Sequence, residues 1–305
     1  MSATAFLFPG QGSQYVGMAK DLYEQHPDAR KLFDQADAIV GFPLSAVCLQ
    51  GPEEELRQTR NTQPAIFLHS IIAARLYRSE QASMAAGHSL GEYSALVYAG
   101  ALTFEDGLRL VRLRGELMQQ AGIEQPGTMA AVVGLEPSAI GDVCRIASDA
   151  GIVQAANFNS PGQIVISGSV AGVRRAMELS KERGAKLVKE LPVSGAFHSP
   201  LMESAKSGLR NALEKTSIHD ASIPVYANVS ARPVRKADEI RRLLNEQLTS
   251  PVRWEETIQN MAADGASTFV EIGPGKVLQG LVKRIRGDVQ TRGIEKFADV
   301  SGQDA

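Results

Sequence analysis

The residues Gly87-His88-Ser89-Leu90-Gly91 predict more of this chain's architecture than any other segment. They have the G-x-S-x-G form of a nucleophile elbow, a sharp strand-to-helix turn that lifts a serine hydroxyl above a sheet. Residues 83–86 form a short apolar run suited to a buried strand, and residues 92–99 form a helical run that Gly100 ends. Ser89 is therefore a candidate nucleophile, the alternative being an ordinary turn with an exposed serine.

The segments on either side of the elbow predict an α/β body. Residues 5–8 indicate a first buried strand, and the loop that follows fails the dinucleotide fingerprint because its third glycine position is Tyr15. Helices are expected at 18–25, 28–40, 52–58, 64–77 and 104–121, with Thr103 as the N-cap of the last. Beyond residue 197, strands are expected at 224–228 and 268–272, and helices at 200–215, 238–248, 254–263 and 276–286.

Between residues 126 and 196 the pattern changes to β-α-β-β-α-β, the order of a ferredoxin-like unit. About 70 residues suffice for a small subdomain. We therefore expect a ferredoxin-like insert at 126–196 within an α/β-hydrolase-like body formed by 1–125 and 197–290. Residues 291–305 are expected to be a C-terminal tail.

Composition excludes several classes of protein. The 305 residues are 44% hydrophobic and 22% charged, as in ordinary soluble globular proteins, and a net charge of −2 gives no indication of nucleic-acid binding. Cys48 and Cys144 lack metal-type spacing and fit a reduced compartment. No signal peptide or membrane-spanning run is visible. These features predict a cytoplasmic protein without a metal site or membrane association.

A serine nucleophile needs a base to take its proton. Of the five histidines, His198 fits best, because it lies in a loop of small residues where the chain re-enters the large body. Its position after the serine matches the hydrolase order of nucleophile first and histidine late. The alternative is a loop histidine that only caps the next helix. His88 is next to Ser89, but adjacent residues on a sharp turn point apart.

Seven motifs resemble those of the malonyl-CoA:acyl carrier protein transacylase family, and they occur along the chain in the family's order. They cover residues 5 to about 286 and are specific only together. They are Phe8-Pro9-Gly10-Gln11-Gly12-Ser13-Gln14, Thr62-Gln63-Pro64-Ala65, Gly87-His88-Ser89-Leu90-Gly91-Glu92-Tyr93-Ser94-Ala95, Met129-Ala130-Ala131, Asn157-Phe158-Asn159-Ser160-Pro161-Gly162-Gln163, Phe197-His198-Ser199 and Glu271-Ile272-Gly273-Pro274-Gly275-Lys276-Val277-Leu278.

The resemblance implies roles for the catalytic groups. It implies that Ser89 carries the acyl group and that His198 is the base. Gln11 and the backbone N–H of Leu90 would form an oxyanion hole for the tetrahedral intermediate, although from its loop alone Gln11 would only satisfy its own turn. A main-chain carbonyl, which the resemblance assigns to Gln247, would orient the histidine in place of a carboxylate.

The resemblance also implies the residues that bind the substrate. Arg114 would bind the substrate carboxylate, since a guanidinium can do so through two parallel hydrogen bonds, whereas helical periodicity alone favours a solvated arginine. Gln63 is implied as a further substrate-binding residue. In related polyketide acyltransferases a phenylalanine at this position accompanies specificity for malonyl rather than methylmalonyl, and Phe197 is similar to it. Leu90, which follows the candidate nucleophile, indicates the same specificity.

These residues together predict an acyltransferase. It would move malonyl from malonyl-CoA to the phosphopantetheine thiol of acyl carrier protein through a malonyl-serine intermediate, without a metal or other cofactor. The product would supply extender units for fatty acid synthesis. A trans-acting acyltransferase of polyketide synthesis, an acyl hydrolase on the same scaffold and a non-catalytic carrier-docking module are the alternatives. A monomer is expected from the resemblance. Because carrier proteins are acidic, we expect a basic rim formed by Lys186, Lys189, Lys283, Arg284 and Arg286.

Overall fold

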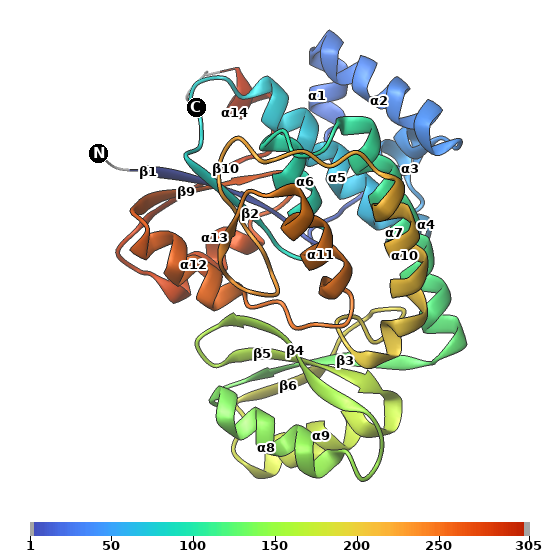
Figure 1. Ribbon diagram of the computed structural model, residues 1–305, viewed down its shortest axis with the longest axis vertical. Helices are drawn as coiled ribbons and strands as arrows, with labels where there is room; N and C mark the ends of the chain where they lie inside the picture. The colour runs from blue at the N-terminus through green and yellow to red at the C-terminus, as the bar shows by residue number, and fades with distance from the viewer. Residues whose placement is uncertain (1–2, 302–305) are drawn as a thin grey trace.

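The apolar residues of β1 (Ala3–Phe8) alternate between the two faces of a central sheet, as the period of a strand requires. Phe6 and Phe8 enter the larger hydrophobic core on one face, while Ala5 and Leu7 enter a second core on the other. The computed structural model describes residues 3–301 (Figure 1). A strand buried on both faces lies at the centre of an α/β layer structure, which is the predicted class.

The central sheet has six strands in the order β10-β9-β1-β2-β7-β8. All neighbouring pairs are parallel except β7 and β8. The strands other than β1 are β2 (Met84–Gly87), β7 (Val225–Tyr226), β8 (Pro233–Val234), β9 (Ala266–Ile272) and β10 (Gln290–Ile294).

Helices cover both faces of this sheet. The face bearing Phe6 is covered mainly by α1 (Lys20–Gln25), α2 (Pro27–Val40), α3 (Leu44–Gln50), α4 (Glu53–Arg57), α5 (Thr59–Leu76), α6 (Gly91–Tyr98), α7 (Phe104–Glu124), α10 (Glu203–Lys215) and α11 (Ala237–Gln247). The other face is covered by α12 (Trp254–Ala263) and α13 (Val277–Ile285). Thr103 caps α7 as predicted, its hydroxyl accepting a hydrogen bond from the Asp106 N–H.

The elbow joins β2 to α6, and its two glycines are needed for close packing. A Cβ on Gly87 would lie 1.9 Å from the Gly91 carbonyl carbon, and one on Gly91 would lie 2.1 Å from the Phe8 carbonyl oxygen. Ser89 between them has a left-handed φ of 52°. The glycines thus bring the elbow against β1 and leave the strained position to the serine.

A second sheet forms the small subdomain, residues 127–190, at the bottom of Figure 1. Its strands are β3 (Gly127–Val133), β4 (Val153–Ser160), β5 (Gln163–Ser169) and β6 (Leu187–Glu190), in the antiparallel order β4-β5-β3-β6. Helices α8 (Pro137–Ala147) and α9 (Val170–Glu182) pack on one face around a separate core. This arrangement confirms the predicted ferredoxin-like order.

Helix α5 begins at Thr59, five residues before the predicted start at Pro64. Proline lacks the N–H that would bond the carbonyl of Arg60, and such a loss ordinarily breaks a helix. Here the Nη1 of Arg112 on α7 donates to that carbonyl at 2.9 Å. The side chain of a neighbouring helix therefore replaces the missing bond.

The predicted tail, 291–305, is wrong for residues 291–300. Strand β10 pairs with β9 at the edge of the central sheet, and the short α14 (Phe297–Val300) follows it. The Phe297 N–H donates to Asp21 of α1 at 2.8 Å, which ties this segment to the body. The sequence here is polar because an edge strand is half exposed. Residues 302–305 lie outside the described residues.

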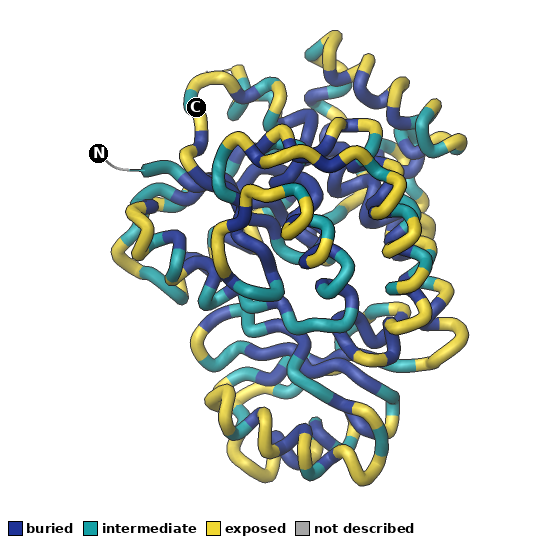
Figure 2. The backbone as a smooth tube through the Cα atoms, in the orientation of Figure 1, coloured by how far each residue is buried: buried dark blue, intermediate teal, exposed yellow. Residues whose placement is uncertain are grey.

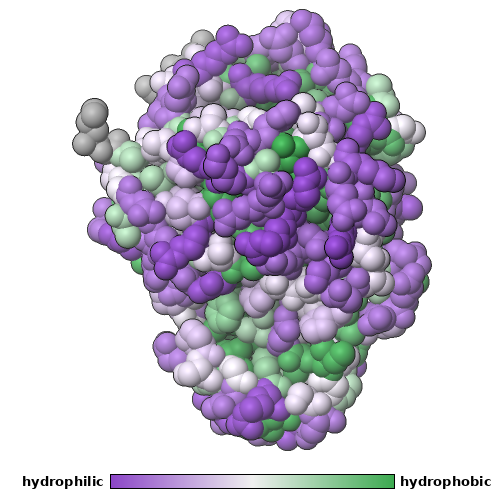
Figure 3. All heavy atoms as spheres, viewed as in Figure 1, coloured by the Kyte–Doolittle hydropathy of each residue, from purple (hydrophilic) through white to green (hydrophobic). Residues whose placement is uncertain are grey.

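Buried backbone concentrates in the central sheet and in α5 and α6, whereas α2, α8 and α9 expose their outer faces (Figure 2). Hydrophilic side chains cover most of the face shown in Figure 3, and hydrophobic ones gather in its lower part, over the small subdomain. Within residues 3–301, none of the helices has the length and apolar character needed to span a bilayer. The polar residues around Ser89 lie at the junction of the two subdomains.

Candidate active site

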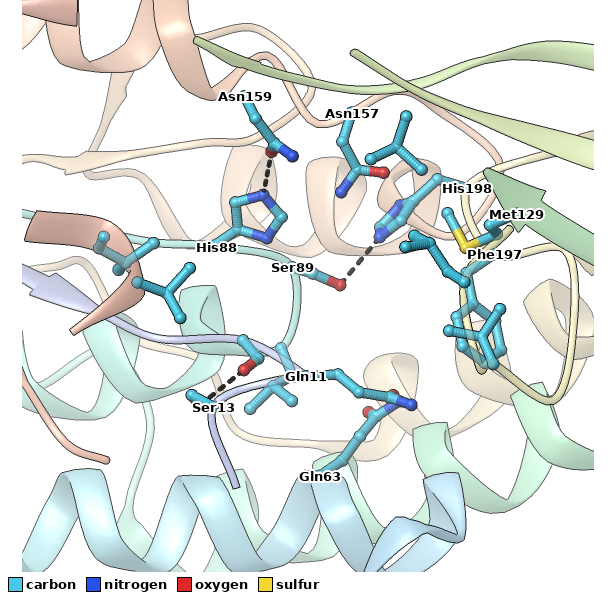
Figure 4. A pocket seen from close by; sticks show the side chains of 18 of the residues that line it. Gln11, Ser13, Gln63, His88, Ser89, Met129, Asn157, Asn159, Phe197 and His198 are labelled. Atoms are coloured by element: carbon cyan, nitrogen blue, oxygen red, sulfur yellow. Dashed lines mark hydrogen bonds between the residues drawn. The ribbon is translucent and has the colours of Figure 1, made fainter. Parts of the chain in front are cut away.

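Ser89 and His198 meet at the end of β2. The Ser89 hydroxyl lies 2.9 Å from Nε2 of His198, as the dashed line in Figure 4 shows. Nδ1 of the same ring lies 2.9 Å from the main-chain carbonyl oxygen of Gln247. Since a carbonyl can only accept, Nδ1 carries the proton and Nε2 is free to accept one from the serine. The predicted geometry of nucleophile, base and orienting carbonyl is present.

His198 is fixed by its loop and by the small subdomain. Its backbone has a left-handed φ of 57°, and the Gln154 amide of β4 donates to its carbonyl at 2.8 Å. The ring is buried, and burial together with the nearby charge of Arg114 lowers the pKa of His198 to about 3. The imidazole is therefore neutral at pH 7, the form in which it acts as a base.

Asn228, just after β7, holds the backbone of the elbow. Its Oδ1 accepts from the Ser89 N–H at 2.7 Å, and its Nδ2 donates to the Gly87 carbonyl at 2.7 Å. These two bonds clamp the residues on which the hydroxyl depends. The sequence analysis placed Asn228 at the end of the predicted strand 224–228 but gave it no role, because the residues around it form no motif.

Arg114 is buried within α7, with 1% of its surface exposed. Its Nη2 donates to the Ser89 hydroxyl at 3.0 Å and to Oε1 of Gln247 at 2.9 Å, while its Nη1 donates to Oε1 of Gln63 at 2.7 Å. The solvated helix arginine that periodicity favoured is therefore wrong. Arg114, Gln63 and Gln247 form one cluster beside the nucleophile.

Behind this cluster lies Glu92, a second residue that the sequence analysis did not assign. Its Oε2 accepts from the Gln247 amide at 2.8 Å and from the Asn228 N–H at 2.9 Å. The Gln247 amide also donates to the Ser89 carbonyl at 3.1 Å. Burial raises the pKa of Glu92 to about 7 although Arg114 is near. A buried carboxyl thus contacts both residues that hold Ser89 in place.

The two predicted oxyanion groups border the same cavity as Ser89. Leu90 precedes α6, and the N–H groups of the next three residues donate to the carbonyls of His88, Ser89 and Leu90. The Leu90 N–H precedes these three, at the start of the helix, where an N–H group has no acceptor within the helix itself. Gln11 follows β1, and its amide lies 3.5 Å from the Thr59 hydroxyl, a contact long enough to be exchanged for a ligand.

The cavity at the junction has a volume of about 220 Å³ and receives side chains from both subdomains. Phe197 borders it beside His198, together with Met129 of β3 (Figure 4). Asn157 of β4 turns toward the same space, and its buried Oδ1 has no hydrogen-bond partner among the described residues. The cavity is therefore mainly apolar, with a few polar groups around the serine, as small-molecule sites commonly are.

The other histidines do not contact the Ser89 hydroxyl. His88 points away from it, and its Nε2 lies 2.9 Å from Oδ1 of Asn159 on β4. His69 lies 2.9 Å from the Glu295 carbonyl, His26 caps α2, and His219 is exposed. Residues 3–301 contain no group of three or more His, Cys, Asp or Glu side chains placed to hold a metal ion.

The five predicted rim residues do not have equal surroundings. Lys186, Lys189 and Lys283 are exposed. Arg284 is exposed and its Nη1 donates to Oε1 of Gln163, which borders the cavity. Arg286 makes two hydrogen bonds to Asp288, at 2.8 and 2.6 Å, so its charge is compensated. Arg284 is therefore the rim cation nearest to the cavity by direct contact.

A serine at the end of a parallel strand, with a neutral histidine 2.9 Å away and an N–H beside it for an oxyanion, defines a serine-dependent acyl-transfer enzyme. Residues 5–294 match the family model described as "Acyl transferase domain". The chain belongs to this acyl transferase family, which it shares with the malonyl CoA-acyl carrier protein transacylases.

Three relatives illustrate the similarity. The malonyl CoA-acyl carrier protein transacylase of Bacillus subtilis (strain 168) is 49% identical over 294 residues, covering 95% of this chain and 93% of its own. The acyl carrier protein S-malonyltransferase of Vibrio cholerae superposes with a TM-score of 0.95 at 43% identity, covering 99% of this chain and 100% of its own. A malonyl-transacylase solved in complex with its type II PKS acyl-carrier protein gives a TM-score of 0.95 at 41% identity, covering 98% of both chains.

Proposed function

We propose that this acyltransferase moves a malonyl group from malonyl-CoA to the phosphopantetheine thiol of an acyl carrier protein. The observation that carries the proposal is the position of Arg114, a buried guanidinium 3.0 Å from the Ser89 hydroxyl. A buried cation at that distance suits an acyl group that ends in a carboxylate. The names of the relatives, and the carrier-protein complex of one of them, support the same substrate and acceptor.

In the first half-reaction, Ser89 attacks the thioester carbonyl while Nε2 of His198 takes the hydroxyl proton. The carbonyl oxygen becomes an oxyanion, and the Leu90 N–H and Gln11 donate to it. When the tetrahedral intermediate collapses, the carbon–sulfur bond breaks and the imidazolium returns its proton to the CoA thiolate. The product is a malonyl-serine ester and free CoA.

The second half-reaction runs the same steps with the carrier's thiol as the nucleophile. His198 takes the thiol proton, the sulfur attacks the ester carbonyl, and the Ser89 oxygen leaves with that proton. Gln247 supplies a neutral carbonyl to Nδ1, so it orients the imidazole without a countercharge. This is sufficient because both half-reactions exchange a thioester and an ester, and neither expels an amine.

Phe197 would set the size of the acyl group. Its ring borders the cavity beside His198, and an acyl group on Ser89 would extend into this cavity. A methyl branch on C2 would compete with the ring for space. We therefore propose malonyl rather than methylmalonyl as the preferred extender unit.

An acyl hydrolase and a polyketide acyltransferase share most of these residues. Arg114 argues against a general acyl hydrolase, because a buried cation disfavours neutral acyl groups. A carrier of fatty acid synthesis and one of polyketide synthesis present the same phosphopantetheine thiol, so both remain candidate acceptors. The predicted monomer, cytoplasmic location, absence of a cofactor and absence of nucleic-acid or membrane binding stay predictions.

Mass spectrometry of the intact protein tests the proposal directly. Mixing the chain with malonyl-CoA should add one malonyl group, and Ser89→Ala should remove that addition. A phosphopantetheinylated carrier should then discharge the ester and gain the malonyl group itself. Loss of the ester to water at the same rate with and without the carrier would indicate a hydrolase instead.

A further inference from the structure

The buried charge of Arg114 has no carboxylate among its direct partners. All three oxygens that accept from it, on Gln63, Ser89 and Gln247, are neutral. Its Nε has no partner among the described residues. A buried cation normally needs a compensating anion. The compensating anion is therefore a residue that contacts one of these direct partners.

Glu92 is the carboxylate that meets this need. The Gln247 amide bridges the two groups, because its Oε1 accepts from Arg114 at 2.9 Å and its Nε2 donates to Glu92 at 2.8 Å. Glu92 is 3% exposed, so water screens little of its interaction with Arg114. The guanidinium and the ionised carboxylate thus form a buried pair of zero net charge across one amide.

Within residues 3–301, Arg114 is the cation that acts on Glu92. Helix α6 packs against β1, β2, β7, α5 and α7, and neither β1 nor β2 contains a titratable side chain. The titratable groups that act on Glu92 are Arg114 of α7 and its own neighbour Tyr93. The other titratable residues of the packed elements have partners of their own. On α5, α6 and β7, Arg60 donates to Gln58, His69 lies against the Glu295 carbonyl, Arg75 lies over the Phe104 ring, Tyr98 accepts from the Ala82 N–H and Tyr226 donates to Asp264. On α7, Arg109 pairs with Glu105, Arg112 with Glu116, Asp106 with Thr103 and Glu124 with Gln120.

A malonyl carboxylate that binds Arg114 brings a second negative charge to this pair. Two carboxylates would then share one guanidinium that is 1% exposed, which raises the free energy of the charged state. We propose that Glu92 is the resident counter-charge of Arg114 and takes up a proton when the malonyl carboxylate binds. The inference rests on the proposed function, because it needs a substrate that carries a carboxylate.

The direction of the pH dependence follows from linkage. Burial already raises the pKa of Glu92 to about 7, and a bound carboxylate would raise it further. Below pH 7 Glu92 is protonated before the substrate arrives, so binding needs no proton. Above pH 7 each binding event must take up a proton, and kcat/KM for malonyl-CoA falls by about 10-fold between pH 6 and pH 8. Acetyl-CoA has no carboxylate and lacks this fall.

The first test needs only the wild-type protein. Acylation of Ser89 is followed by intact mass at low substrate concentration, with malonyl-CoA and acetyl-CoA, from pH 6 to pH 8.5. Because the CoA part is common to both, the ratio of the two kcat/KM values isolates the acyl group. We expect this ratio to fall by about 10-fold from pH 6 to pH 8. Parallel profiles would overturn the inference.

Glu92→Gln is the matching variant, since an amide has the shape of the protonated carboxyl. Its ratio of kcat/KM for malonyl-CoA to kcat/KM for acetyl-CoA should stay constant between pH 6 and pH 8, where the wild-type ratio falls by about 10-fold. The control is Glu271→Gln. Glu271 is equally buried, its pKa is also raised to about 7, and it caps α13 through the Leu278 and Gln279 N–H groups. This control should keep the wild-type pH profile.

Proton uptake gives a readout that does not depend on rates. In a weakly buffered dye solution at pH 7.5, formation of malonyl-serine should consume about 0.8 proton per site in the wild type and almost none in Glu92→Gln. Equal loss of both substrates at every pH in Glu92→Gln would assign Glu92 a purely structural role and overturn the inference. Absence of any malonyl-serine in the wild type would overturn the proposed function itself, a separate outcome.

Discussion

Replacing Arg114 with alanine should separate malonyl-CoA from acetyl-CoA. The guanidinium is 1% exposed and 3.0 Å from the Ser89 hydroxyl, so a carboxylate separated from the reacting carbonyl by one methylene can pair with it out of water. At an effective dielectric constant of about 20, charges about 4 Å apart attract by about 4 kcal/mol. Truncating one member of a buried charge pair costs about 2–5 kcal/mol.

This free energy corresponds to a loss of about 30-fold to several thousand-fold in kcat/KM for malonyl-CoA. Acetyl-CoA should lose nothing. It should gain, because Arg114 is one cause of the lowered His198 pKa and its removal makes the imidazole a stronger base. Arg114→Lys should recover only part of the malonyl activity, since an ammonium cannot form the two parallel hydrogen bonds.

The assay is kcat/KM for both substrates in the wild type, Arg114→Ala and Arg114→Lys. Arg109→Ala is the matched control, because Arg109 lies on the same helix but is exposed and pairs with Glu105. Circular dichroism checks the fold, since the truncation leaves two buried amide oxygens without their donor. Equal losses for the two substrates would refute the carboxylate role and leave Arg114 a structural residue.

Three further predictions concern the base, the rim and the elbow. His198→Ala should slow acylation by about 10²–10⁴-fold. Because the pKa of His198 is lowered to about 3, wild-type kcat/KM for acetyl-CoA, which does not depend on Glu92, should stay level from pH 7 down to pH 5, and a rate that falls through pH 6.5 would contradict this. Reversing the charges of Lys186, Lys189, Lys283 and Arg284 together should raise the carrier's KM and leave malonyl-CoA acylation unchanged. Replacing Arg286 by Gln and Asp288 by Asn together should do little, because these two charges already compensate each other; the salt dependence of transfer provides the check. Gly87→Ala should yield little folded protein, because its Cβ would meet the Gly91 backbone at 1.9 Å, and a wild-type melting temperature would refute the packing argument.

The elements that the sequence predicted are those with a local physical cause. The elbow, the Thr103 cap and the β-α-β-β-α-β order follow from glycine placement, capping and periodicity, and each is present. The start of α5 was missed because its cause is not local. The carbonyl left free by Pro64 is bonded by Arg112, a residue on another helix.

The polar cluster around Ser89 was only partly predictable for the same reason. Ser89 and His198 are marked by glycines and small residues in their own loops. Arg114 and Gln247 lie on helices whose periodicity places them near solvent, and the resemblance alone raised their importance. Glu92 and Asn228 were not assigned at all, because only the tertiary structure brings their hydrogen bonds behind the elbow.

The edge of the central sheet shows a similar limit. Strand β10 alternates weakly because one of its sides has no neighbouring strand and much of it is exposed. Its pairing with β9 is specified by a partner that precedes it by some twenty residues. Short, polar edge strands therefore cannot be predicted from apolar periodicity.

Both ends of the Ser89–His198 hydrogen bond lie in left-handed backbone conformations, with φ values of 52° and 57°. Each such conformation costs a residue with a Cβ on the order of 1 kcal/mol, and glycine would largely relieve it. Directed evolution scored only by melting temperature would therefore favour glycine at both positions. The survivors of such a screen would be better-folded proteins with no acyltransferase activity, so thermostability libraries of this scaffold need a turnover step in the selection.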